Sequence, residues 1–375
     1  MRVLILSCNT GEGHNSCAVS LKEYFSAQGA SCDVTDALAF LSERMSRFIS
    51  NWHTRIYRHF PFLFRSGYRF AEEHPGIFRE QSEVYRLLTS GAGRLYRLLR
   101  DGQYDTVICT HVFAAFMMEV LLKEHPKMWK TCFLATDYTC SPHGSGHALD
   151  WYFIPDDDLA EDFIRSGIPA EKLVGTGIPV RMEFQKRNDR ERAKLDLGLA
   201  SNCRHLLVMC GSMGCGPIQK VVEHLVSILP ENAAVSVICG TNNRLRQTME
   251  KQFAQNPRVK IWGYVNQVPL MMDSADLYLT KPGGISVTEA AVKRLPMAFV
   301  DAVAGCEAYN MRYFMDRGGA VTADTPKELA DACVRLLSDG QQLEAMSTCL
   351  EALHMGNASE KIYQILSGDP VCDPK

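Results

Sequence analysis

Several features that would assign a function directly are missing from this chain of 375 residues. Its 14 cysteines form no CxxC pair and no Cys/His zinc spacing. Many of them lie inside apolar, strand-like runs, among them Cys109, Cys132, Cys210 and Cys239. Cysteines used as small core residues indicate a reducing cytosol and exclude a disulfide-stabilised secreted domain. The formal charge of -3 gives no overall nucleic-acid signature.

Long hydrophobic runs are lacking too. The apolar run near Met1 is too short for a signal peptide, and no stretch reaches transmembrane length. We therefore expect a cytoplasmic protein. A hydrophobic content of 46% and a charged content of 22% are typical of globular chains, and 375 residues fit two domains of ordinary size.

Apolar runs of strand length alternate with helical patterns along both halves of the chain. The expected strands are 3–6, 31–37, 105–111, 130–138, 150–155, 204–212, 233–240, 259–264, 276–284 and 296–302. This alternation predicts an α/β fold of two Rossmann-like parallel-sheet domains facing a central cleft. From Lys172 on, a Gly/Pro-containing segment leads into a highly charged one. This change of composition marks the boundary at about 180–202, so the domains are expected at 1–180 and 203–375. The last helical stretch, 343–366, could pack back onto the first domain.

The first strand and helix are joined by a polar, glycine-containing turn in VLILSCNTGEGHNSCAVSLKEYF, residues 3–25. His14 lies between this turn and the first helical residues. Ligands of open α/β sheets bind at the carboxyl ends of strands, which is where His14 is expected. A polar turn residue or a helix cap is the plainer interpretation of the same histidine.

Lysine is absent between Arg44 and Arg100, where eleven arginines face only four acidic residues. Within a predicted insert at about 38–100, aromatic residues and arginines are interleaved. One interpretation is a core of aromatic rings covered by arginines, and another, which the lack of a supporting basic fold disfavours, is nucleic-acid stacking. We favour contact with an anionic membrane surface, where rings lie at the headgroup boundary and arginines attract lipid phosphates. The predicted contact residues are Trp52, Arg55, Arg58, Phe62, Phe64 and Arg65.

The second half carries two glycine-containing turns, each directly after an expected strand. In MCGSMGCGPIQK, residues 209–220, the glycines are at 211, 214 and 216 and a helix follows. In TKPGGISVTEA, residues 280–290, Gly283 and Gly284 precede a helix whose first turn holds Ser286 or Thr288, and Glu289 follows. Glycine allows close approach of a phosphate, and a helix start faces its charge. A carboxylate at 289 can accept both hydroxyls of a ribose, although it could also cap an ordinary helix.

The second motif, with GYVNQVPLMMDSADL before it and AVAGCEAYNMRYF after it, resembles the sugar-nucleotide site of the family 28 glycosyltransferases. NTGEGHNSCA, ATDYTCSPHG and GTGIPVRMEF resemble the narrower branch of monogalactosyldiacylglycerol synthases and processive diacylglycerol glucosyltransferases. The similarity spans about 1–365. It implies the GT-B fold, a UDP-sugar donor and a diacylglycerol acceptor.

The resemblance also implies roles for single residues in the donor site. Glu289 would bind the ribose, Gly211 and Ser212 would lie on the diphosphate, and Arg181 would place its guanidinium against the same phosphates. By the same resemblance, Tyr264 and Val265 would hold the uracil, and Glu307 and Asn310 would reach the sugar hydroxyls. Relatives usually have Gln where this chain has Cys306 and Gly where it has Tyr309. A thiol does not donate and accept as an amide does, so the identity of the sugar stays open.

An inverting transfer needs a base for the proton of the acceptor hydroxyl, and histidine suits that task near neutral pH. The resemblance puts a catalytic or acceptor-binding histidine at His14. Asp137, which follows an expected strand, could orient His14, act as the base itself, or form only an Asx turn. We expect His111 to be a strand-end turn residue. His143 and His147 have no third ligand beside them, so no metal and no other cofactor is expected.

These observations predict an inverting glycosyltransferase that moves glucose or galactose from a UDP-sugar to diacylglycerol, at the inner face of the cell membrane. No nucleic-acid partner is expected. Two alternatives stay open. One is a UDP-sugar 2-epimerase on the same fold, which would have no use for a membrane-binding insert. The other is a non-catalytic module that binds nucleotide sugars or lipids.

Overall fold

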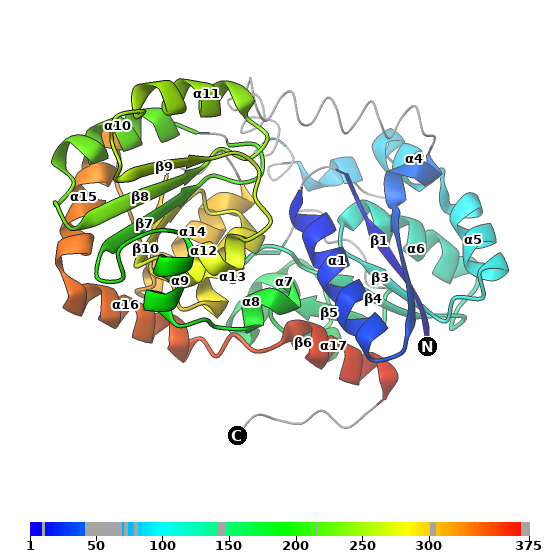
Figure 1. The fold of residues 1–375 in the computed structure, drawn as a ribbon. Coiled ribbons are helices and arrows are strands. Elements are labelled where there is room, and N and C mark those ends of the chain that lie inside the picture. The colour runs from blue at the N-terminus through cyan, green and yellow to red at the C-terminus, as the bar shows by residue number, and fades with distance from the viewer. Residues whose placement is uncertain are drawn as a thin grey trace. The chain divides into compact units, whose positions relative to one another are not determined.

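The computed structural model describes residues 1–9, 12–41, 70, 74–78, 82–140, 148–214, 216–300 and 305–368. The chain divides into two compact units (Figure 1). Unit 1 comprises Met1–Met182, Val303–Cys306 and Gly356–Lys375, and unit 2 comprises Glu183–Ala302 and Glu307–Met355. The predicted membrane-contact residues, from Trp52 to Arg65, lie outside the described residues, as do His143 and His147.

Unit 1 contains a six-stranded parallel sheet in the order β2-β1-β3-β4-β5-β6. Its strands are β1 (Arg2–Ser7), β2 (Ser31–Asp36), β3 (Thr106–Cys109), β4 (Lys130–Leu134), β5 (Trp151–Ile154) and β6 (Leu173–Gly175). Its helices are α1 (Glu12–Ala27), α4 (Glu83–Thr89), α5 (Ala92–Asp101), α6 (Val112–Glu124), α7 (Ala160–Arg165) and α17 (Ala358–Ser367). Short 3-10 turns occupy Ala37–Phe40, Pro75–Phe78, Asp157–Leu159 and Ala170–Lys172.

Unit 2 contains a second six-stranded parallel sheet, in the order β12-β11-β10-β7-β8-β9. The strands are β7 (Arg204–Met209), β8 (Ala233–Ile238), β9 (Val259–Trp262), β10 (Leu277–Thr280), β11 (Met297–Phe299) and β12 (Ala320–Thr322). The helices are α8 (Met182–Gln185), α9 (Arg190–Asp196), α10 (Ile218–Ile228), α11 (Asn243–Gln252), α12 (Val268–Ser274), α13 (Gly284–Val292), α14 (Cys306–Asp316), α15 (Pro326–Ser338) and α16 (Gly340–Ala352). The first residue of α8 belongs to unit 1, as does the first residue of α14.

The pattern of residues explains the layers. Strands β1, β3 and β8 are buried almost throughout, as expected of parallel strands with helices on both faces. Helix α6 is apolar on nearly every side because it packs against α4, α5 and β3. In unit 2, α15 packs against α10 and against β7, β10 and β11. The expected α/β fold of two parallel-sheet domains is confirmed.

In each sheet, the chain adds strands first on one side of its first strand and then on the other side. In unit 1, β2 lies on one side of β1 and β3 on the other, and in unit 2, β8 lies on one side of β7 and β10 on the other. Such a topological switch point leaves room for a ligand beyond the carboxyl ends of the two strands. The switch points therefore lie between β1 and β3 and between β7 and β10.

Each of the ten strands expected from the sequence overlaps a strand of the structure, but two short strands and one helix boundary were missed. Strands β6 and β12 were not expected, because three residues are too few for a recognisable period. The expected helical stretch 343–366 is two helices, α16 and α17, separated at 353–357. Helix α17 packs on α1 in unit 1, where Tyr363 contacts the ring of Phe25 and the Lys130 Nζ donates to the Leu366 carbonyl at 2.7 Å.

Candidate functional site

The switch point of unit 1 holds His14, in the first turn of α1. The side chain is half-buried, and its Nδ1 lies 2.6 Å from the carbonyl oxygen of Thr110, which directly follows β3. The Thr136 hydroxyl, after β4, lies 3.2 Å from the same nitrogen. Because a carbonyl oxygen only accepts, Nδ1 of the neutral ring carries the proton and Nε2 carries the lone pair. This is the tautomer that a general base acting through Nε2 requires.

The turn that carries His14 is held by a chain of side-chain hydrogen bonds. The Ser7 hydroxyl donates to Asn15 Oδ1 at 2.6 Å, and Asn15 Nδ2 donates to Asn9 Oδ1 at 2.9 Å. Asn9 Nδ2 then donates to Asp36 Oδ2 at 3.0 Å, at the end of β2. These contacts join the ends of β1 and β2 to the start of α1, so they limit how far His14 can move.

The other unit 1 candidates follow later strands of the same sheet. Asp137 is half-buried in the bend directly after Thr136. His111 caps α6, with its Nδ1 accepting the Phe113 backbone N–H at 3.2 Å. Arg181 is half-buried in unit 1, two residues after Pro179, whose carbonyl accepts the Cys17 thiol at 3.7 Å. Among the described residues, no group of three His, Cys, Asp or Glu side chains is arranged to hold a metal ion.

The switch point of unit 2 is lined by the two glycine turns. Gly211 and Gly214 follow β7 with φ angles of +70° and +54°. A Cβ at position 214 would lie 2.4 Å from the Cys239 carbonyl oxygen, so only glycine fits there. The Ser212 carbonyl accepts the Thr241 backbone N–H at 2.8 Å, which ties this turn to the one after β8. The turn is therefore closely packed on its inner side.

The second turn leads into α13. Gly283 is its N-cap and Gly284 its first residue, so Ser286 lies in the first turn whereas Thr288 does not. The Thr288 hydroxyl donates to the Gly284 carbonyl at 2.6 Å inside the helix. Glu289 lies one residue further and is only 7% exposed. Asn310 is fully buried and donates from Nδ2 to the Pro282 carbonyl at 3.0 Å, which stabilises the turn.

Lys281 is a residue that the sequence patterns did not single out. Its side chain passes beside both turns: a Cβ on Gly211 would lie 3.0 Å from its Cε, and one on Gly283 would lie 3.7 Å from its Nζ. The ammonium group ends on Glu307 Oε1 at 2.6 Å. A lysine directly after a buried strand and before a glycine pair was the available signal. The structure thus brings a cation and Glu307 together beside both glycine turns.

The remaining donor-site candidates differ in exposure. Tyr264, after β9, is 68% exposed and Val265 is half-buried. Cys306, at the start of α14, is half-buried, and Tyr309 is 46% exposed.

A cavity of about 480 Å³ in unit 2 lies away from both glycine turns. It is lined by charged residues of both signs, among them Arg187, Arg190, Asp273, Lys293, Arg294 and Glu351. Several of its lining residues precede β10 and β11, so it opens at the amino ends of these strands. Ligands of parallel sheets bind at the opposite, carboxyl ends, and we do not assign this cavity to the candidate site.

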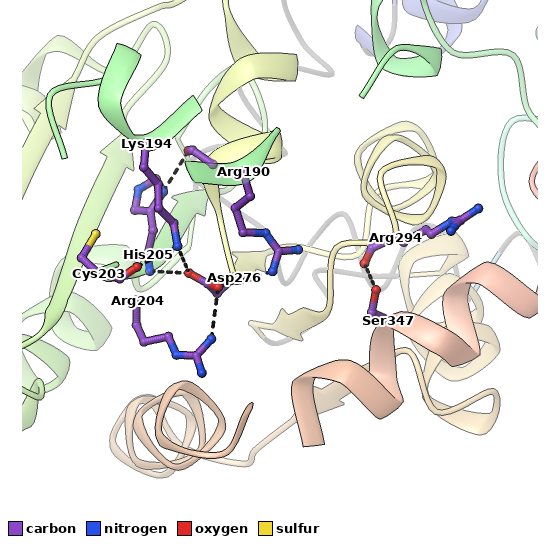
Figure 2. A network of polar contacts seen from close by, with 9 residues as sticks. Arg190, Lys194, Cys203, Arg204, His205, Asp276, Arg294 and Ser347 are labelled. Carbon is purple, nitrogen blue, oxygen red and sulfur yellow. Dashed lines mark hydrogen bonds and ion pairs between the residues drawn. The ribbon is translucent and has the colours of Figure 1, made fainter. Parts of the chain in front are cut away.

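Next to this cavity, a buried ionic network anchors the charged segment that follows unit 1 (Figure 2). Asp276, 3% exposed, accepts from Lys194 Nζ and from the His205 backbone N–H, both at 2.8 Å. Arg190 and Arg204 approach its other oxygen at 3.4 and 3.3 Å. Burial alone would raise the pKa of Asp276, but the hydrogen bonds from Lys194 and His205 hold it below its usual value.

His205 completes this network from inside the unit. It is fully buried, with Nδ1 3.0 Å from the Ser274 hydroxyl, and its Nε2 has no hydrogen-bond partner. Burial lowers the pKa of His205 to about 4, because the charged ring would lose its hydration. The neutral histidine is therefore a structural core residue and not part of the candidate site.

Two family descriptions match the chain. Residues 14–180 match monogalactosyldiacylglycerol (MGDG) synthase, and residues 205–362 match the glycosyltransferase family 28 C-terminal domain. A processive diacylglycerol beta-glucosyltransferase of Staphylococcus epidermidis is 26% identical over 371 residues, covering 97% of this chain and 92% of the relative. The enzyme of the same name from Bacillus subtilis is 27% identical over 374 residues, covering 97% and 94%.

Solved structures share the fold at lower identity. MurG of Acinetobacter baumannii superposes with a TM-score of 0.69 at 14% identity, covering 98% of this chain and 99% of that one. Anabaena HepE in complex with UDP gives 0.60 at 13% identity, covering 98% and 100%. A putative UDP-N-acetylglucosamine 2-epimerase from Listeria monocytogenes gives 0.62 at 12% identity, covering 98% and 96%. At these identities, the likenesses establish the fold alone.

Proposed function

This chain belongs to the family 28 glycosyltransferases and has their GT-B fold, and we propose that it transfers a hexose from a UDP-sugar to diacylglycerol. The observation that carries the proposal is the relationship to diacylglycerol glucosyltransferases over 97% of the chain. Glucose is favoured because both of these relatives are named for it. Galactose stays the second candidate, because the model matching residues 14–180 is named for galactose transfer and Cys306 departs from the usual glutamine.

In the proposed reaction, the acceptor hydroxyl oxygen attacks the anomeric carbon of the donor. His14 Nε2 takes the hydroxyl proton as the new bond forms, and Thr110 keeps the other ring nitrogen protonated. The bond from the anomeric carbon to the diphosphate breaks, and its electron pair leaves with UDP. Attack opposite the leaving group inverts the anomeric carbon, which fits the β-linkage in the relatives' names, since the sugar of UDP-glucose is α-linked.

We propose that positively charged groups of this chain stabilise the negative charge of the leaving diphosphate. Lys281 lies beside both glycine turns, and the first backbone N–H groups of α13 begin at Gly284. Arg181 is proposed to add a second cation. Glu289 is proposed to accept the ribose hydroxyls, Tyr264 and Val265 to hold the uracil, and Glu307 to contact the sugar. No metal is needed in this scheme.

The enzyme is proposed to work at the inner face of the cell membrane. Support comes from the arginine-rich, aromatic segment of the sequence and from a lipid acceptor that does not leave the bilayer. None of the helices in the described part of the chain is long and apolar enough to cross a membrane.

A donor panel tests the proposed function. Purified protein is incubated with diacylglycerol vesicles and labelled UDP-glucose, UDP-galactose or UDP-N-acetylglucosamine, and the lipid extract is separated by thin-layer chromatography. We expect a labelled glycolipid with UDP-glucose. A glycolipid with UDP-galactose alone would reassign the sugar. Labelled free sugar nucleotide that changes to its 2-epimer, with no lipid product, would identify an epimerase, and donor binding without any product would identify a binding module.

A further inference from the structure

His111 is an aromatic neighbour of the proposed base. The ring centroids of His14 and His111 lie 4.6 Å apart at an interplanar angle of 70°, an edge-to-face contact. The contact follows from the sheet: Leu6 of β1 pairs with Cys109 of β3, so the residues after these strands are brought side by side. The His111 ring also makes an edge-to-face contact with Phe113, with the ring centroids 4.4 Å apart.

The hydrogen bonds of the two rings fix opposite tautomers. His111 Nδ1 accepts the Phe113 backbone N–H, so this nitrogen carries the lone pair and the proton of the neutral ring is on Nε2. His14 Nδ1 donates to the Thr110 carbonyl, so its lone pair is on Nε2. The hydrogen bond from the Phe113 N–H belongs to the neutral form of His111, because a protonated Nδ1 has no lone pair to accept it.

We propose that His111 is a positioning residue for the transfer: its neutral ring holds the imidazole of His14 in the orientation that keeps Nδ1–H on the Thr110 carbonyl and the lone pair on Nε2. The inference rests on the proposed function of His14 as base. It gives His111 a role in addition to capping α6.

Two variants separate positioning from capping. His111→Asn keeps an N-cap acceptor but removes the ring, whereas His111→Phe keeps the ring and removes the acceptor. We expect His111→Asn to lower kcat for glycolipid formation by about tenfold to a hundredfold with an unchanged KM for UDP-glucose, because the base is misplaced. His111→Phe should retain most of kcat and show a lower melting temperature. A wild-type kcat in His111→Asn would overturn the inference, since a pure cap would be preserved.

A second measurement does not depend on transfer. In protein labelled with ¹⁵N-histidine, long-range ¹H–¹⁵N spectra report each ring's tautomer, with His14 and His111 assigned from the signals lost in His14→Ala and His111→Asn. We expect Nδ1–H for His14 and Nε2–H for His111, and a mixture of tautomers for His14 in His111→Asn but not in His111→Phe. A single unchanged His14 tautomer in His111→Asn would overturn the inference. A wild-type protein that makes no glycolipid would instead reject the proposed function, while the spectra still decide the role of His111.

Discussion

At the scale of single residues, His14 illustrates how a sequence motif and a tertiary contact combine. Its place after a buried strand was visible in the sequence, but its tautomer depends on the Thr110 carbonyl, 96 residues along the chain. Glu289 is a comparable case: the motif put it after the first turn of a helix, and the fold leaves it only 7% exposed. A single substitution can test the role proposed for each of these residues.

The first prediction concerns the base. His14→Ala should lower the rate of glycolipid formation by about 10² to 10⁴, the usual contribution of general base catalysis, and leave the Kd for UDP unchanged. Transfer is followed with labelled donor, and UDP binding by calorimetry. His125→Ala, which removes a histidine stacked on Tyr96 at the other end of α6, is the matched control. Wild-type turnover in His14→Ala would remove this residue from the mechanism.

The second prediction concerns the ribose. Glu289→Ala should raise the Kd for UDP by about tenfold to a hundredfold, because hydrogen bonds to a charged group contribute about 1.5–3 kcal/mol. Glu344→Ala, at an exposed position of α16, should leave the Kd unchanged. Circular dichroism checks that both variants are folded. An unaltered Kd in Glu289→Ala would show that the ribose is bound elsewhere.

The third prediction follows from His205, whose folded-state pKa of about 4 lies below the ordinary value of 6.5. Below about pH 6.5, the unfolded chain binds a proton that the folded chain does not, so the free energy of unfolding should fall as the pH drops toward 4. The shift corresponds to about 3 kcal/mol. His205→Gln should remove this part of the pH dependence in urea titrations at pH 7 and pH 4.5. An equal loss of stability in variant and wild type would contradict it.

At the scale of elements, helix α9 shows that the charged segment at the domain boundary is packed against unit 2 and is not an exposed linker. Composition alone indicates a boundary at 180–202, yet Lys194 of α9 is buried against Asp276, just before β10. Helix α9 also packs on α12. A buried cation and a buried anion stabilise this docking only as a pair, because each is costly alone.

The fourth prediction tests this pair. Lys194→Met should lower the free energy of unfolding by about 3 kcal/mol, because Asp276 would keep its charge in a buried site without its closest cation. The double variant Lys194→Met/Asp276→Asn should recover part of that loss. Denaturant titrations of the wild type, both single variants and the double variant give the coupling energy.

As a control on the same helix, Arg192→Met, which removes an exposed pair with Asp196, should change stability by less than about 1 kcal/mol. A Lys194→Met variant as stable as Arg192→Met would contradict the role given to the buried pair.

At the scale of the whole molecule, the two sheets repeat one plan. In each, the candidate residues gather where the order of strands reverses: His14, Thr110 and His111 beyond β1 and β3, and Gly211, Lys281 and Gly283 beyond β7 and β10. The family relationship adds a lipid acceptor to this plan in the proposed function. The proposed contact with a membrane surface belongs to this scale as well, because it would bring that acceptor to the protein.

The fifth prediction concerns that contact. The protein should sediment with vesicles that contain anionic lipid and dissociate at high salt, because arginines attract lipid phosphates through a screened interaction. Replacing Arg55, Arg58 and Arg65 together by Gln should weaken partitioning by about two orders of magnitude, at about 1 kcal/mol for each charge. The matched control replaces Arg192, Arg244 and Arg312 of unit 2. Equal sedimentation of both triple variants would contradict the predicted contact segment.

The fold class, most strands and the motifs of the candidate site follow from the amino-acid sequence, because buried parallel strands and the glycine turns after them are local patterns. Which strand ends become neighbours is a matter of tertiary structure. Only the strand order places Thr110 and His111 beside His14, and Lys281 beside Gly211, since these partners lie far apart along the chain. Tertiary structure also decides that Lys194, in the charged boundary segment, forms a buried ion pair with Asp276. Whether a charged side chain loses its hydration depends on what packs around it and not on its neighbours in the sequence.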